Sequence, residues 1–166
     1  MNLLLDEFLD VLKLHAELYG SLLSVLKEEK GAISESRPEM LNDVNNKKKA
    51  LVLKIQNLED RRLNILERLS DALERPVQDL TLTKLSQFTE KPHSTRLKTS
   101  RANLSSLLKE VREANDNNRS LLTHSADLVK GSMVLLNNLI ASNAVYYRSG
   151  KIRNKDKNGR VFSGEI

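Results

Sequence analysis

The feature that most constrains this chain is a heptad pattern of apolar residues between about residues 37 and 74. The pattern has alternating spacings of three and four, and its apolar positions are Leu41, Val44, Leu51, Ile55, Leu58, Ile65 and Leu69. This spacing places them on one narrow face of a helix about 55 Å long, as in a coiled coil. Lys48 and Arg62 are the two polar residues at positions of the same pattern. The sequence therefore predicts a long helix with a coiled-coil seam.

A second long helix is predicted before it, over about residues 2–34. Its broad apolar face runs from Leu5 to Leu26. Ser36 and Glu39 have the spacing of a capping box, and Pro38 suits a first helical turn. A short turn between two long helices makes them antiparallel neighbours. The charge runs at 47–49 and 61–62 are interpreted as solvated flanks of the seam.

The sequence of the second half of the chain predicts a short helix followed by a very long one. Pro76 ends the preceding helix, and Thr81 or Asp79 is expected to cap a helix over about 80–89 that closes one end of the bundle. Residues 95–147 are predicted to form one helix near 80 Å long. We therefore expect an all-α fold, an elongated antiparallel helical bundle or coiled-coil hairpin with a long C-terminal helix. The expected domain spans 1–147, followed by a basic, mobile tail over 148–166.

Polar residues interrupt the seam of the long helix. Asn115 and Asn118 fall on or beside it, and such residues fix register in coiled coils. They are predicted to form a register-fixing polar core. Gly131 and Ser132 are consistent either with a kink or with a close contact between crossing helices.

The stretch 131–147 is the candidate binding surface. It contains no charged residue, whereas 30% of the chain is charged. Its apolar positions follow the spacing of one helix face, but they form a stripe wider than one neighbouring helix covers. One interpretation is the most buried helix of a bundle. The other is a surface that receives a partner's helix. The candidate partner-binding residues are Leu135, Leu136, Leu139, Ile140, Val145 and Tyr146.

Composition narrows the class of protein. Cysteine is absent, so disulfides and thiol catalysis are excluded, and a reducing compartment is favoured. Acidic residues stand near the N-terminus where a signal peptide needs positive charge. No apolar run approaches the ~18 residues of a membrane span. We therefore expect a cytoplasmic protein.

Positive charge is concentrated in the last nineteen residues, which hold six basic and two acidic side chains. The rest of the chain is nearly neutral, so a broad basic groove for a duplex is not indicated. The tail itself could bind an anionic polymer or membrane, although Phe162 alone is available there for base stacking.

The sequence lacks the usual patterns of a catalytic or metal site. His15, His93 and His124 are scattered, and the His124–Asp127 pair is a weak metal signal. No phosphate-binding glycine loop or nucleophile elbow occurs. We expect no enzyme activity, no metal and no cofactor.

Two local patterns stand in the second half of the chain. Asn115, Asn118, Leu121 and Leu122 form an Asn-x-x-Asn-x-x-Leu-Leu stretch, and residues 146–150 form a Tyr-x-x-x-Gly ending. Together with the order of the helices, these patterns resemble those of the FlgN family of flagellar export chaperones. The resemblance covers nearly the whole chain. The 47–51 stretch lacks the acidic residue of the family's heptad pattern, and the tail is longer and more basic than the family's.

The resemblance implies a cytoplasmic chaperone of type III flagellar export. Its partners would be hook-associated junction proteins of the FlgK and FlgL type, whose amphipathic terminal helices it would cover before secretion, and the flagellar export apparatus. The resemblance also implies that Tyr146 or Tyr147 docks to the export gate. A tyrosine that anchors the helix end is the alternative. A self-associating coiled-coil module, or a protein that binds anionic polymers or membranes through its tail, remains the alternative function.

Overall fold

The computed structural model describes residues 1–142 of the 166, and this part contains four α-helices, one 3-10 helix and no strand. The elements are α1 (Asn2–Ser34), α2 (Pro38–Leu73), η1 (Val77–Asp79), α3 (Leu82–Phe88) and α4 (His93–Ser142). The all-α prediction is confirmed. Residues 1–123 form one compact unit, and the rest of α4 belongs to a second unit. No helix within the described part is both long and apolar enough to cross a membrane.

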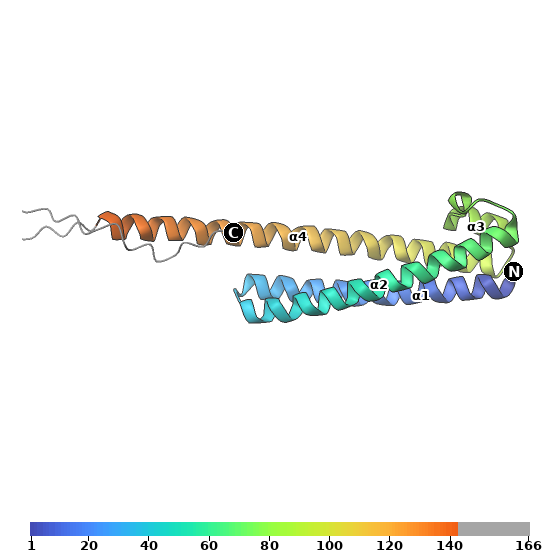
Figure 1. The fold of residues 1–166 in the computed structure, drawn as a ribbon, viewed down its shortest axis with the longest axis horizontal. Coiled ribbons are helices and arrows are strands. Elements are labelled where there is room, and N and C mark those ends of the chain that lie inside the picture. The colour runs from blue at the N-terminus through green and yellow to red at the C-terminus, as the bar shows by residue number, and fades with distance from the viewer. Residues whose placement is uncertain (143–166) are drawn as a thin grey trace, which may run out of the picture. The chain divides into compact units, whose positions relative to one another are not determined.

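Helices α1 and α2 form an antiparallel hairpin (Figure 1). The predicted capping box is wrong. Ser36 instead ends α1 with a left-handed backbone (φ 53°), and its N–H donates to the carbonyl of Ile33. The next N–H, of Arg37, donates to Ala32, which completes a Schellman motif and satisfies carbonyls at the helix end. Ser36 is therefore part of the motif that ends α1, and the N-cap of α2 is Arg37.

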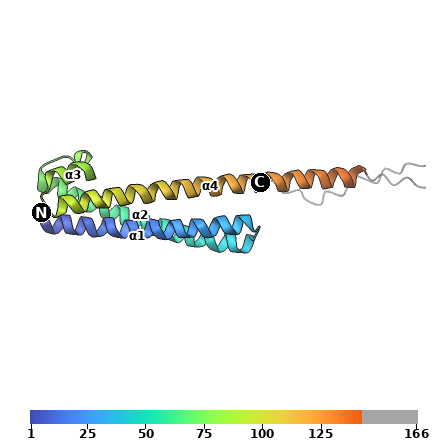
Figure 2. The ribbon, with the colours of Figure 1, turned by 180° about the vertical axis from the view of Figure 1, so that it is seen from behind.

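Helix α4 begins beside the start of α1 and runs in the same direction (Figure 2). At this end, Oδ1 of Asp6 lies 3.2 Å from His93 Nε2 and accepts a hydrogen bond of 2.7 Å from Arg96 Nη1. Some 35 Å further along the helices, at 1.5 Å per residue, Asn118 bonds to Leu26 and Glu29 of α1. Within residues 1–123, the hairpin and α4 therefore make a three-helix arrangement.

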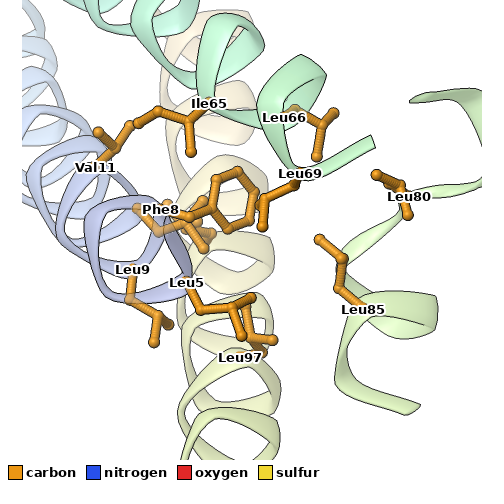
Figure 3. Close-up of a cluster of buried hydrophobic side chains, with 12 residues drawn as sticks. Leu5, Phe8, Leu9, Val11, Ile65, Leu66, Leu69, Leu80, Leu85 and Leu97 are labelled. Atoms are coloured by element: carbon orange, nitrogen blue, oxygen red, sulfur yellow. The ribbon is translucent and has the colours of Figure 1, made fainter. Parts of the chain in front are cut away.

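The segment between α2 and α4, which contains η1 and α3, is called the connector. The hydrophobic core lies where α1, α2 and α4 meet the connector (Figure 3). Phe8 is 1% exposed, and Leu69 and Leu97 are fully buried. The connector adds Leu80 and Leu85, which are also buried. Thr81 Oγ1 accepts a hydrogen bond of 3.3 Å from Lys84 N, so the predicted threonine cap of α3 is confirmed. Burial of each large side chain contributes about 1.5–3 kcal/mol.

A polar layer follows this core along the hairpin. His15 is 3% exposed, and its Nε2 lies 3.8 Å from a carboxylate oxygen of Glu59. Arg62 donates two hydrogen bonds to Glu59, of 2.8 and 2.7 Å. The prediction that the charge runs are solvated flanks is wrong for Arg62 and for Lys48, because both side chains are partly buried in ion pairs. Both occupy seam positions, where the partner helix limits access to water.

The Glu59–Arg62 pair gives the fold a dependence on acidic pH. The hydrogen bonds from Arg62 lower the pKa of Glu59 below its ordinary 4.5. A carboxyl whose pKa is lower in the folded state contributes stability above its unfolded pKa, and this is lost as pH falls through the folded pKa. We expect Glu59→Gln to lower the free energy of unfolding at pH 7 by less than about 1 kcal/mol, because the pair is partly exposed. Urea unfolding measures this difference, which should shrink as pH falls below 4.5, and an equal difference at every pH would contradict this assignment.

Candidate functional site

The candidate binding surface lies on α4 between Leu128 and Ile140. All apolar side chains in this part of the helix are exposed, from 42% at Met133 to 70% at Ile140. Six of them share one face, because they recur at spacings of three, four and seven. We call this face the apolar stripe: Leu128, Val129, Leu135, Leu136, Leu139 and Ile140. Val134 is 57% exposed but lies on the opposite side of the helix.

The stripe contains four of the predicted partner-binding residues, and it extends toward the N-terminus beyond them. Leu135, Leu136, Leu139 and Ile140 are on it. Val145, Tyr146 and Tyr147 lie outside the described residues. Leu128 and Val129 extend the stripe, and their side chains are 60% and 59% exposed. The interpretation of this stretch as the most buried helix of the bundle is wrong for its described residues, because the structure leaves these side chains in contact with solvent.

Gly131 lies inside the stripe, and α4 is helical on both sides of it. A methyl group added at this glycine would meet nothing within 4 Å among the described residues. The described residues therefore show no close contact between crossing helices at Gly131. Such a contact needs a second backbone near the glycine.

The two asparagines predicted to form a polar core differ in environment. Asn118 is 4% exposed, and its Nδ2 donates hydrogen bonds to Leu26 O (2.7 Å) and Glu29 Oε2 (2.9 Å). Asn115 is exposed, so the prediction is wrong for this residue. In the described part of α4, the buried seam positions are Leu97, Leu104 and Asn118, which are separated by multiples of seven. Asn115 falls between them, on the flank of the helix.

Sequence reasoning missed Glu29 and the true position of Lys48. Glu29 is 7% exposed, with one carboxylate oxygen bound to Asn118 and the other to the Lys48 ammonium. A signal was present, because Lys48 interrupts the apolar heptads of α2 at a seam position. The burial of Lys48 could have been predicted by searching α1 for an acidic residue at a buried position that would pair with it.

A second hydrophobic feature lies between α1 and α2. It is an open groove of about 480 Å³ beside Leu14, Leu18 and Leu58, with Glu17, Ser21, Lys54 and Asn57 completing its lining. Its exposed and polar rim contrasts with the stripe, where six apolar side chains lie together without an intervening charge. Large exposed apolar surfaces commonly mark protein-binding sites, so the stripe is the stronger candidate.

The geometry defines an all-α protein whose last helix carries an exposed apolar face. The chain belongs to the FlgN family, the flagellar export chaperones, because the model of that family, described as FlgN protein, matches residues 1–154. This confirms the resemblance that the asparagine and tyrosine–glycine patterns indicated. No curated protein matches the chain. No solved structure matches it either.

Proposed function

We propose that this chaperone binds the amphipathic terminal helices of hook-associated junction proteins of the FlgK and FlgL type. It would act in the cytoplasm, before type III export, and would prevent the client from folding or polymerising early. It would catalyse no reaction and need no cofactor. The exposed apolar stripe is the observation that carries this proposal.

The stripe has the chemistry that an amphipathic helix requires. Leu135 is 66% exposed and Leu136 is 57% exposed, so a client helix could remove substantial apolar area from water at each. Such burial is worth about 25 cal/mol per Å² before the cost of association is subtracted. Leucine and isoleucine side chains four residues apart, as at 135 and 139 and at 136 and 140, form ridges between which the side chains of another helix pack.

The direct test is a binding titration of the full chain with purified junction proteins. Each junction protein is used intact and without its terminal helix, and a peptide of the same composition in scrambled order is the control. The proposal expects the intact protein to bind and the truncated and scrambled forms not to bind. Equal binding of the intact and truncated forms would contradict it.

Self-association through the same stripe is the second candidate, because an exposed apolar face can also receive a second copy. Light scattering on the free chain distinguishes the two functions. A stable oligomer that persists when a junction protein is added would favour self-association. Conversion to a complex of one chaperone with one client would favour the chaperone.

We further propose that a tyrosine after the stripe docks the loaded chaperone to the export gate. Tyr146 and Tyr147 are the candidates, and Tyr146 is also a candidate client contact. Tyr147→Ala should therefore leave client affinity unchanged and reduce secretion of the client, whereas Tyr147→Phe separates the role of the ring from that of the hydroxyl. A secretion assay beside a binding titration checks this, and normal secretion by Tyr147→Ala with Tyr146 intact would remove Tyr147 as the docking residue.

A further inference from the structure

Two kinds of contact hold α4 on the hairpin, one apolar and one polar, and they lie at different positions along the helix. Its first half contributes two buried leucines, Leu97 and Leu104. Beyond Leu104, the one buried side chain of α4 in the described part of the chain is polar, and it is Asn118. The apolar residues between them are half-buried, namely Leu107, Leu108, Val111 and Ala114. A hydrophobic core therefore secures the first half, whereas a polar contact lies at the end of the second.

The polar contact joins all three long helices. Asn118 Nδ2 on α4 donates to the carbonyl of Leu26 and to Oε2 of Glu29, both on α1. The Lys48 ammonium, on α2, donates to the other carboxylate oxygen of Glu29. Both oxygens of a nearly buried carboxylate are thus satisfied. Loss of either donor would leave a buried acceptor without a partner, which is costly.

This contact is one of several side-chain layers that repeat every seven residues along the three helices. Counting back in sevens from Glu29 on α1 gives Leu22, His15 and Phe8, which are all buried. The matching series on α4 runs from Asn118 through Val111 and Leu104 to Leu97. On α2 it runs from Lys48 through Ile55 and Arg62 to Leu69. Apolar layers at Phe8 and Leu22 therefore alternate with polar layers at His15 and Glu29.

Asn118 is the one polar member of the four residues in the α4 series, and it discriminates between registers of α4. A shift of one heptad would place Val111 or Ser125 beside Glu29 in place of Asn118. Valine has no donor for the carboxylate, and a serine hydroxyl has one proton, whereas the Asn118 amide donates to two acceptors. Buried polar groups of this kind select register in coiled coils.

We propose that Glu29, Lys48 and Asn118 form a polar latch that holds residues 105–123 of α4 in one register on α1 and α2. The latch sets the point at which the buried part of α4 ends. Glu29 is its central residue, because it accepts hydrogen bonds from both other members. The link from the latch to client binding rests on the proposed function, but the latch itself does not.

Spin labels on paired cysteines test the latch directly in the full chain, which has no native cysteine. The distal pair replaces Lys27 and Ser120, and the reference pair replaces Asp10 and Thr99, all of which are exposed. Asn118→Asp removes the donor and adds a second carboxylate beside Glu29. Asn117→Asp, the same change at the exposed neighbouring position, is the matched control. Pulsed electron spin resonance measures the distribution of distances within each pair.

The latch predicts that Asn118→Asp broadens the distal distribution and leaves the reference distribution narrow. Adding Glu29→Gln restores a donor opposite the introduced carboxylate and should narrow the distal distribution again. Hydrogen exchange of residues 105–123 should be at least about tenfold faster in Asn118→Asp, which is the expected effect of losing hydrogen bonds to a charged group. Broadening of both pairs, or of neither, would overturn the proposal.

A client titration with Asn118→Asp then tests the link to function. Altered affinity together with a broadened distal distribution supports a positioning role for the latch. Unchanged affinity overturns that link. Failure of the unmodified chaperone to bind any client would contradict the proposed function, and the distance distributions would still decide the latch.

Discussion

Leu135→Glu is expected to weaken binding of a junction protein's terminal helix by about 100-fold or more while the chaperone keeps its fold. Leu135 is 66% exposed in the free chain, so a glutamate there meets water and changes stability by no more than about 0.5 kcal/mol. In the complex, the same glutamate would lie within an apolar interface. Lost burial of about 1.5–3 kcal/mol and the cost of desolvating a charge then add. Calorimetric titration of the client measures the change.

Val134→Glu is the matched control for this prediction. Val134 is adjacent in sequence and 57% exposed, but it lies on the opposite side of α4 from the apolar stripe. The control should bind the client with nearly the affinity of the unmodified protein. Equal losses from the two substitutions would mean that charge or helix propensity, rather than the stripe, determines binding.

Leu69→Ala is expected to lower the free energy of unfolding by about 2–5 kcal/mol, the usual cost of removing a buried leucine side chain. Leu69 is fully buried in the cluster that joins α1, α2, α4 and the connector (Figure 3). Its loss creates a cavity between elements that are far apart in sequence, so their cooperative unfolding should move to lower denaturant concentration. Urea unfolding followed by circular dichroism measures the shift.

Leu53→Ala makes the same chemical change on the same helix at a position that is 60% exposed. We expect a change within about 0.5 kcal/mol. Comparable losses at the two positions would show that Leu69 does not occupy the core that the structure describes.

The helices were predictable because their signals are local and repeated. Apolar heptads on α2, the proline of the connector and the Thr81 cap each act within a few residues. The predicted α1 has the same bounds as the observed helix, Asn2–Ser34, and α3 begins two residues later than predicted, at Leu82. The error at Ser36 arose because one serine suited two roles, and the Schellman motif at the end of α1 prevailed over the capping box.

The polar layers were less predictable because they depend on contacts between distant residues. Lys48 and Glu29 are nineteen positions apart, and Glu29 and Asn118 are eighty-nine apart. The sequence shows each as a charged or polar residue near a helix face. Only the alignment of the three helices shows which polar groups bond to one another. The sequence therefore placed Asn115 and Asn118 in the core together, although only Asn118 lies there.

The binding surface was predictable in part. Absence of charge identified the end of α4, but it could not distinguish a buried helix from an exposed one. Leu135, Leu136 and Ile140 are exposed in the structure, which favours the exposed helix over the buried one. The roles of these residues in client binding, and those of Tyr146 and Tyr147, stay predictions that the experiments above address.

The most direct test is to record methyl NMR spectra of the full chaperone as a junction protein's terminal helix is added. The proposed function predicts that the largest shifts occur in the methyl groups of the apolar stripe, at Leu128, Leu135, Leu136 and Ile140. The core methyl groups of Leu69 and Leu97 should change little. Shifts concentrated at Leu14, Leu18 and Leu58 in the groove between α1 and α2, with the stripe unchanged at saturation, would contradict it.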